Sequence, residues 1–434
     1  MKPYPKYKNS GVEWLGEVPE HWMVTHLKTP FNSANGGLFK DGDWIESVNI
    51  SDDGIRYITT GNVGEGIYKE QGDAYISEEI FHKLSCTEVC PGDILISRLN
   101  KPIGRACIVP DLGCRVVTSV DNVICRVGPD FYAKYIVYRF TASDYWHELG
   151  LIASGATMQR IGRKELGYVR VAWPPLPEQQ AIAVFLDAET ARIDSLISDY
   201  ESLIALLREE RQAVISHAVT KGLNPDVPMK DSGVEWLGQV PEHWDVMPLK
   251  RIASLCTERS NATLFPVALD NIESWSGRYI ENNAEYESAG TAFQPGDILF
   301  GKLRPYLAKV WLADRPGEAV GDFHVIRTWL PNIPAFLLRL LLSRDLISLI
   351  DGSTYGAKMP RASWEFIGSL PIPIPTSKEQ QAIAAFLDAE TARIDSLIAD
   401  AEKAIELLRE SRTALISDAV TGKIDVRDWQ QENA

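Results

Sequence analysis

The chain has 434 residues, of which 45% are hydrophobic and 24% are charged, and its formal net charge is −15. These proportions are those of packed globular domains and exclude a chain that is disordered throughout. The richest apolar run, Phe336–Leu342, is far shorter than the roughly 18 residues of a membrane span, and the N-terminal segment lacks the apolar core of a signal peptide. We therefore expect a cytoplasmic protein with roughly two to four domains and no membrane partner.

The sequence contains an internal duplication. The block Asn9–Trp22 (NSGVEWLGEVPEHW) returns almost unchanged at Asp231–Trp244, and the block Glu178–Asp199 (EQQAIAVFLDAETARIDSLISD) returns at Glu379–Asp400. Between them PGDIL occurs in both halves, and GATMQR in the first half is matched by GAKMPR in the second. A period of about 200 residues predicts two domain-plus-helix units rather than a solenoid of short repeats.

The repeated blocks set the expected domain limits. We expect a first globular domain at 1–176, a helix at 177–223, a second globular domain at 224–375 and a second helix at 376–434. The helical blocks are nearly identical, whereas the globular segments match only at scattered positions. Constant segments suit a fixed scaffold or a shared partner, and divergent segments suit two different ligands. Relaxed drift in unimportant loops is the alternative explanation.

Within each globular segment the pattern predicts a mixed α/β (α+β) fold. One helix is expected after the strands of each segment, at Ala133–Glu148 and at Pro334–Ile350. Proline-rich stretches follow at Trp173–Gln180 and Pro371–Gln381, and because proline cannot continue a strand ladder, we expect the domains to end there. Runs rich in β-branched and aromatic residues predict strands at Arg56–Thr60, Asp93–Ser97, Ala106–Val109, Asn122–Val127, Asp297–Phe300, Ala308–Leu312 and Phe323–Trp329.

A long amphipathic segment follows each domain. Apolar or small residues recur at alternating steps of four and three over 193–218 and again over 394–419, with Arg211 and Arg412 as the exceptions. This heptad pattern predicts two helices of about 40 residues, each ended by a glycine, that form a coiled coil. Antiparallel pairing within the chain, with a pseudo-two-fold axis relating the two domains, is the economical arrangement. Pairing with another protein is the alternative.

The sequence contains none of the catalytic motifs that we sought, which include a phosphate-binding loop, a zinc-protease helix, a nucleophile elbow and an amino-methyltransferase block. The six cysteines include no CxxC pair, so reduced thiols are expected rather than a structural metal. His21, His26 and His243 lie in or beside the repeated EHW block and are expected at the surface or in caps, while Asp41 and Asp52 are expected to shape turns. We predict no catalytic residue and no metal site.

Polar, basic and glycine-bearing loops recur at equivalent places of the two globular segments. Segment Ser97–Ala106 matches Gly301–Val310, and segment Ser154–Leu166 matches Tyr355–Phe366. Arginine and lysine can contact phosphates or guanine, and asparagine and glutamine can pair with adenine, so these loops are candidate DNA-reading surfaces; ordinary solvated loops are the alternative. The residues that we assign to DNA binding are Asn62, Arg98, Asn100, Lys101, Arg105, Thr157, Gln159, Arg160, Arg163, Lys164, Asn271, Lys302, Arg304, Lys309, Tyr355, Lys358 and Arg361.

The acidity of the chain lies mainly outside the globular segments. Residues 24–176 carry 16 basic and 18 acidic side chains, residues 246–375 carry 13 of each, and the helices and the junction between the halves hold most of the excess acid. Because whole-chain charge does not decide what a local surface binds, DNA recognition remains open. Near-neutral domains predict weak DNA binding by this chain alone, since phosphate contacts dominate affinity.

The order of these blocks, from GVEWLGEVPEHW through PLPEQQAIAVFLDAETARIDSLI to the repeat of both, resembles the specificity subunit of type I restriction-modification systems over nearly the whole chain. The resemblance implies two target-recognition domains, each reading one half of a split, asymmetric site in double-stranded DNA. It also implies helices that act as a spacer and dock two modification (methyltransferase) subunits, which an ATP-dependent restriction subunit can join. S-adenosylmethionine, ATP and magnesium would then be bound by those partners, and no cofactor by this chain.

Two alternatives remain open at this point. The first is the specificity subunit of a modification-only or phage-defence methyltransferase, which nothing in the sequence separates from that of a restriction system. The second is a protein-interaction scaffold that carries two ligand-binding domains on a coiled coil and does not bind DNA. The missing catalytic motifs disfavour a self-sufficient enzyme.

Overall fold

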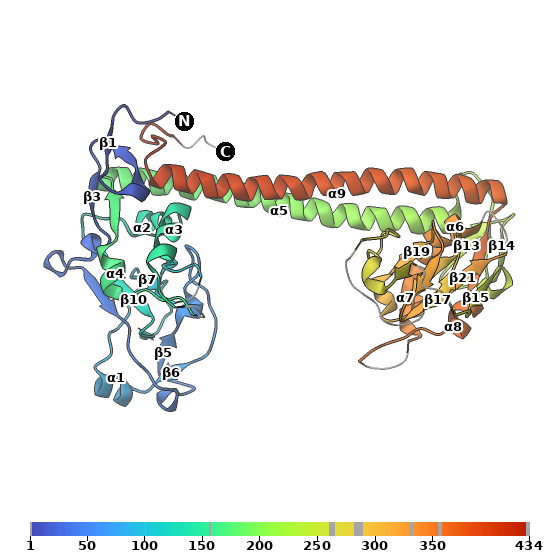
Figure 1. The fold of residues 1–434 in the computed structure, drawn as a ribbon, viewed down its shortest axis with the longest axis horizontal. Helices are drawn as coiled ribbons and strands as arrows, with labels where there is room; N and C mark the ends of the chain where they lie inside the picture. Colours follow the sequence, from blue (N-terminus) through green and yellow to red (C-terminus); the bar gives the residue numbers. More distant parts are fainter. Residues whose placement is uncertain are drawn as a thin grey trace. The chain divides into compact units, whose positions relative to one another are not determined.

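The computed structural model describes residues 2–99, 101–155, 158–259, 265–281, 290–329, 333–354 and 358–430. Its contacts divide the chain into two compact units: unit 1 comprises Met1–Asp199 and Ala404–Ala434, and unit 2 comprises Tyr200–Lys403 (Figure 1). Each unit contains one globular domain and parts of both long helices, α5 (Leu176–Lys221) and α9 (Ser377–Val420).

The domain of unit 1 is built from short strands and four short helices. The strands are β1 (Tyr7–Asn9), β2 (Glu17–Pro19), β3 (Met23–His26), β4 (Leu38–Asp41), β5 (Ile55–Ile58), β6 (Tyr75–Ile76), β7 (Ile94–Ser97), β8 (Ala106–Ile108), β9 (Val116–Thr118), β10 (Asn122–Arg126) and β11 (Arg170–Trp173). The helices are α1 (Glu78–Leu84), α2 (Ala133–Arg139), α3 (Ser143–Ile152) and α4 (Arg163–Tyr168). An antiparallel sheet has the order β4-β10-β7-β8, a second sheet has the order β6-β5-β9, and β1-β2 and β11-β3 form pairs.

The domain of unit 2 repeats this plan. Its strands are β12 (Met229–Asp231), β13 (Gln239–Pro241), β14 (Asp245–Pro248), β15 (Ala253–Cys256), β16 (Pro266–Val267), β17 (Thr291–Phe293), β18 (Ile298–Gly301), β19 (Val310–Leu312), β20 (Gly317–Ala319), β21 (Phe323–Thr328) and β22 (Pro371–Ile374). Its helices are α6 (Ile333–Leu341), α7 (Arg344–Gly352) and α8 (Trp364–Ser369). The sheet order β15-β21-β18-β19 corresponds to that of unit 1. The smaller sheet β16-β20-β17 contains one parallel pair, as β6-β5-β9 does, but a different strand lies at its centre. The predicted mixed fold and internal duplication are thus confirmed.

The predicted strands are confirmed with ends that shift by one or two residues, but two other predictions need correction. Each of the two segments predicted as a single helix forms two consecutive helices. The chain is extended at Ala142 and at Ser343, and a new helix begins directly after each. The proline-rich stretch Pro371–Ile374 is itself strand β22. Because β22 pairs with β14 alone, an edge position tolerates the N–H groups that its prolines lack.

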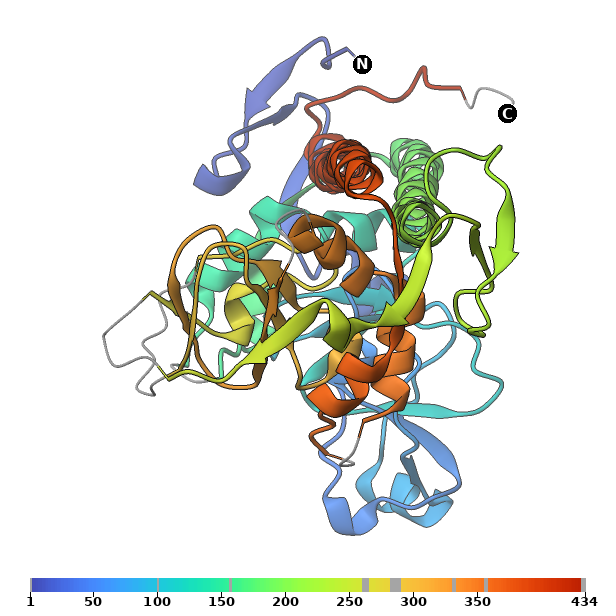
Figure 2. The ribbon, with the colours of Figure 1, turned by 90° about the vertical axis from the view of Figure 1, so that its right-hand side faces the viewer.

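The two long helices pair antiparallel within each unit, as predicted, and Figure 2 shows them side by side in a view along their axes. The seam is buried: Ile204 of α5 is 7% exposed and Ile394 of α9 is 0% exposed. The two arginines that interrupt the heptad pattern each pair with an aspartate of the other helix. Arg211 lies 3.0 Å from Asp395 in unit 2, and Arg412 lies 2.9 Å from Asp194 in unit 1. Among the described helices, none has the apolar composition that a membrane span requires.

The repeated EHW and EQQ blocks contact each other in both units. In unit 1 the carboxylate of Glu178 accepts hydrogen bonds from the Trp22 indole at 2.7 Å and faces the His21 ring at 2.7 Å. In unit 2 Glu379 makes the same contacts with Trp244 and His243. Each EHW block thereby fastens its domain to the first turn of the helix that follows that domain. The ring of each histidine lies against the carboxylate of the glutamate.

Apolar packing joins each domain to both long helices. The largest core of unit 1 contains Trp22, Trp173 and Phe140 together with Phe185 of α5 and Val420 of α9. The core of unit 2 contains the equivalent combination of domain and helix residues. The N- and C-terminal segments also meet in unit 1, where the Asp425 N–H donates to the carbonyl of Lys2 at 2.8 Å.

Candidate nucleic-acid interface

Three loops of the domain of unit 1 meet at one end of the strands β7 and β10. The N–H of Arg98, directly after β7, donates to the carbonyl of Asp121, directly before β10, at 2.8 Å. The carbonyl of Arg98 accepts from the N–H of Ile161, in the loop after α3, at 3.1 Å. We name residues 98–99, 101–105, 119–121 and 158–164 loop cluster 1. It brings together side chains that are predicted to bind DNA and that lie as far apart in the sequence as Arg98 and Lys164.

The domain of unit 2 has the same loop arrangement. The N–H of Lys302 donates to the carbonyl of Asp322 at 2.9 Å, and the carbonyl of Lys302 accepts from the N–H of Ala362 at 3.0 Å. We name residues 302–309, 320–322 and 358–363 loop cluster 2. Because these backbone bonds do not depend on side chains, the frame is shared by the two clusters while their side chains differ.

Aspartates neutralise several cations of loop cluster 1. Arg160 lies 2.7 Å from Asp121, while Asp41 lies 2.8 Å from Arg163 and 3.2 Å from Arg98. Arg98 is only 6% exposed, and burial lowers its pKa, although the charge of Asp41 opposes that effect. Arg98 is therefore an interior residue that joins the loops, and its predicted contact with DNA is replaced by a structural role. Arg160, whose side chain is 47% exposed, faces the surface.

An equivalent ion pair lies at the centre of loop cluster 2. The guanidinium of Arg361 donates to both carboxylate oxygens of Asp322, at 3.0 and 2.9 Å, and Lys302 lies 3.7 Å from the same group. The hydrogen bonds from Arg361 hold the pKa of Asp322 below its usual value. Arg361 thus corresponds to Arg160, and each is oriented by the aspartate that precedes the neighbouring strand.

Two predicted asparagines lie in the interior. Asn62 is 3% exposed; its side-chain oxygen accepts from the Thr59 N–H at 2.9 Å, and its amide donates to the carbonyls of Lys69 and Gln71. Asn271, which is 1% exposed, likewise accepts from a backbone N–H at 2.9 Å and donates to a carbonyl at 3.2 Å. Their amides stabilise matching turns, and this structural role replaces the predicted contact with adenine.

Two predicted cations support the same turns. Arg105 donates to the carbonyls of Val63 at 2.7 Å and Leu99 at 3.1 Å, and Lys309 donates to the carbonyl of Leu269 at 2.6 Å. Burial lowers the pKa of Arg105. Both side chains therefore connect an asparagine turn to a loop cluster, and their contact with DNA stays a prediction.

The remaining predicted residues lie at the surface of the loop clusters. Exposed or half-buried side chains are those of Lys101, Gln159, Lys164, Arg304 and Lys358. Two methionines in the same loops, Met158 and Met359, are 59% and 47% exposed and were not among the predicted residues. Their signal was present in the matching GATMQR and GAKMPR segments, and apolar side chains can contact thymine methyl groups. Asn100, Thr157 and Tyr355 lie outside the described residues.

The helices carry a second repeated surface. Leu196 of α5 and Leu407 of α9 are 36% and 55% exposed in unit 1, and their counterparts Leu397 and Leu206 are 42% and 64% exposed in unit 2. Each unit therefore presents one exposed leucine from each helix at equivalent positions. In the described part of the chain, no group of three histidine, cysteine or acidic residues is placed to hold a metal ion.

Two domains with a shared loop frame and different outward side chains, each joined to parts of both long helices, present two related but distinct surfaces. A family model described as "Type I restriction modification DNA specificity domain" matches residues 269–407. The EcoDI type I restriction enzyme specificity subunit of Escherichia coli is 23% identical to the chain, with 64% of this chain and 67% of that protein aligned. The MjaX specificity subunit of Methanocaldococcus jannaschii, a protein named as putative, is 24% identical over 95% of this chain and 96% of its own length.

Solved structures share the fold. A chain from a structure titled "Structural basis underlying complex assembly and conformational transition of the type I R-M system" superposes with a TM-score of 0.70 at 13% identity and covers 94% of this chain and 99% of its own length. The HsdS subunit of Thermoanaerobacter tengcongensis superposes with a TM-score of 0.58 at the same identity, over 94% and 98% of the two chains. The chain is thus similar in sequence and in fold to type I restriction-modification specificity subunits.

Proposed function

We propose that this chain supplies the DNA sequence specificity of a type I restriction-modification complex by reading a split, asymmetric site, with one loop cluster on each half-site. The observation that carries the proposal is the pairing of one loop frame with two sets of outward side chains. Loop cluster 1 presents Gln159 and Arg160, whereas loop cluster 2 presents Lys358 and Arg361. Because base edges are distinguished by the hydrogen-bonding groups that face them, the two half-sites should differ in sequence.

The arginines and the lysines of the loop clusters have different proposed roles in DNA binding. Arg160 and Arg361 are held in place by Asp121 and Asp322, so their guanidinium groups are oriented before DNA arrives. Oriented guanidinium groups suit base contacts, whereas exposed lysines such as Lys358 suit phosphates, which fix position without reading sequence. The aspartates reduce the net positive charge, so this chain alone should bind DNA weakly and should depend on partner subunits for additional phosphate contacts.

Two methyltransferase subunits are the partners that we propose for the helices. The two sets of exposed leucines are equivalent in position, and two equal surfaces suit two copies of one partner. These subunits would bind S-adenosylmethionine and modify adenine, and a restriction subunit that uses ATP and magnesium can join them. This chain would hold no cofactor and would act by placing the DNA.

A domain exchange tests the proposed function. Residues 24–176 are replaced by the corresponding segment of a family relative, and methylated adenines are located by sequencing the DNA of cells that carry the exchanged chain with its methyltransferase. The expected result is a new sequence in one half-site and no change in the other half-site. The matched exchange of residues 246–375 should change the opposite half-site. Changes in both half-sites after either exchange would contradict independent reading, and the absence of any site-specific methylation in the unaltered system would contradict the proposed function.

A further inference from the structure

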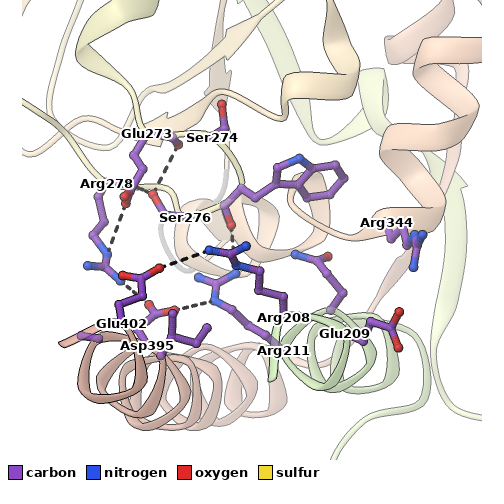
Figure 3. Close-up of a pocket in the computed structure, with 14 residues that line it drawn as sticks. Arg208, Glu209, Arg211, Glu273, Ser274, Ser276, Arg278, Arg344, Asp395 and Glu402 are labelled. Carbon is purple, nitrogen blue, oxygen red and sulfur yellow. Dashed lines mark hydrogen bonds and ion pairs between the residues drawn. The ribbon is translucent and has the colours of Figure 1, made fainter. Parts of the chain in front are cut away.

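Besides the ion pair of Arg339 with Asp388 and the contact of Glu379 with the EHW block, the second domain is fastened to the paired helices in two further ways. The first is apolar: Ile215 and Val219 of α5 and Ile383 of α9 share one core with Trp244 of the domain. The second is polar and lies around Asp395 of α9, which pairs with Arg211, one helical turn before Ile215 in α5 (Figure 3). A single apolar contact area allows a domain to rotate about it, whereas a second attachment along the helix prevents that rotation.

The polar attachment brings three elements onto one carboxylate. Asp395 accepts from Arg211 of α5 at 3.0 Å and also pairs closely with Arg278 of the domain. Arg211 donates in addition to the carbonyl of Trp275, in the same domain loop as Arg278, at 2.9 Å. Figure 3 shows these side chains converging between the two helices and the loop. We name Arg211, Trp275, Arg278 and Asp395 the stem clamp.

The clamp holds its loop in an uncommon backbone conformation. Trp275 has a φ of 64°, in the left-handed region that residues other than glycine rarely adopt. Its counterpart in unit 1 is Gly66, with a φ of 87°; the N–H of Trp275 donates to the carbonyl of Ala308 and that of Gly66 to the carbonyl of Ala106. A strained non-glycine residue persists where its surroundings fix it, and here Arg211 binds its carbonyl.

Unit 1 provides the matched comparison. Arg412 and Asp194 occupy the same helix positions as Arg211 and Asp395 and lie 2.9 Å apart. In the described part of unit 1, the hydrogen bonds of Arg412 go to Asp194 and not to the domain. The Arg412 side chain is 38% exposed, whereas the Arg211 side chain is 7% exposed. The equivalent arginine–aspartate pairs therefore join two helices in unit 1 and join two helices and a domain loop in unit 2.

We propose that the stem clamp determines which spacer length between the half-sites is accepted, by fixing the rotation of the second domain on its helices. This inference rests on the proposed function, since it requires that the chain reads a split site. One added base pair moves a half-site by about 3.4 Å and turns it by about 35° about the DNA axis. A clamped domain follows neither change, whereas a domain without the clamp keeps fewer attachments to the helices and can rotate further toward the displaced half-site. The clamp residues are positioning residues and read no base.

Two variants and one control test the proposal. Asp395→Asn and Arg278→Gln weaken the clamp, and Asp194→Asn weakens the equivalent helix pair of unit 1 without affecting any domain contact. Each chain is purified with the methyltransferase that accompanies it in its host. Methyl transfer is then measured on duplexes that carry the native half-sites with the native spacer, or with one base pair more or fewer. We expect each clamp variant to raise the rate on the altered spacers, relative to the native spacer, by about tenfold, the factor that corresponds to one charge-assisted hydrogen bond.

The outcomes separate the clamp from the proposed function. Asp194→Asn should keep the spacer preference of the unaltered chain. An unchanged spacer preference in both clamp variants, or a change in the half-site bases, would overturn the proposal. If Asp395→Asn does not assemble, Arg278→Gln decides, because that side chain is 58% exposed and its replacement leaves Arg211 paired with Asp395. An unaltered chain that directs no site-specific methylation would instead overturn the proposed function.

Discussion

The indole nitrogen of Trp22 donates to the carboxylate of Glu178 at 2.7 Å, and the same contact recurs between the EHW and EQQ blocks of the second half. Both partners come from blocks that the chain repeats almost without change. The contact couples the two blocks, because replacing Glu178 would leave the buried indole of Trp22 without its partner.

Replacing Glu178 with alanine should destabilise unit 1. Glu178 is 6% exposed and accepts from the buried Trp22 and Tyr4 side chains, so its loss leaves two buried donors unpaired. We expect a loss of about 1–3 kcal/mol in the free energy of unfolding and a fall in melting temperature of roughly 2–4 °C per kcal/mol, measured by calorimetry. As the control, Glu20→Ala removes an exposed pair with Lys6 at 3.9 Å and should change stability little. Equal effects of the two substitutions would refute the anchoring role of Glu178.

Glu379, the equivalent carboxylate of unit 2, should make the free energy of unfolding depend on pH. Partial burial alone would raise the pKa of Glu379, but hydrogen bonds from Thr376, His243 and Trp244 outweigh it and lower the pKa from 4.5 to about 2. A lowered pKa means that the folded state favours the charged form. Its contribution is therefore fully present above about pH 4.5 and is lost as the pH falls toward 2.

The variant Glu379→Gln isolates this contribution. The difference in unfolding free energy between the unaltered chain and the variant should be largest near neutral pH and should shrink through that acidic window. Urea unfolding at a series of pH values measures it. A difference that stays constant with pH would show that the charge of Glu379 does not stabilise the fold.

An exposed lysine of loop cluster 2 should contribute affinity without specificity. Lys358 lies at the surface, where a side chain can reach a phosphate. We expect Lys358→Ala to weaken DNA binding of the assembled complex similarly for all sequences, and to reduce the slope of log affinity against log salt concentration by about one. Fluorescence anisotropy over a salt series measures both effects. Lys6→Ala, an exposed lysine in the N-terminal segment, serves as the control. A changed half-site preference would instead identify Lys358 as a base contact.

The sequence alone predicted the duplication, the mixed fold and the paired helices, because repeated blocks and heptad spacing are local patterns. It could not predict the partners of Arg211 and Arg412, since these depend on the register between two helices that lie far apart in the chain. The candidate loops were found because they recur, yet the direction of a side chain is not a local property. Asn62 lies inside because its amide donates to the carbonyls of Lys69 and Gln71, which lie beyond its own turn.

The acidic partners in the loop clusters were missed for a related reason. Asp121 and Asp322 look like ordinary turn residues in the sequence. Their role follows from the pairing of β10 with β7 and of β21 with β18, which places each aspartate beside a loop that arrives from elsewhere in the chain. Within the candidate site, the sequence therefore identified the segments, and the strand pairing decides which side chains face outward.

Lengthening both helices by one heptad should lengthen the unread gap between the half-sites. The helices α5 and α9 run without a break through the division between the units, after Asp199 and after Lys403. Seven helical residues inserted at both positions preserve the heptad register and add about 10.5 Å, which corresponds to roughly three base pairs at 3.4 Å each. Sequencing of methylated adenines should therefore show the same two half-sites separated by about three more base pairs. Insertion of four residues at both positions, which breaks the heptad register, is the control and should abolish site-specific methylation. An unchanged gap after the heptad insertion would show that the helices do not set the spacing, and altered half-site bases would show that they take part in reading.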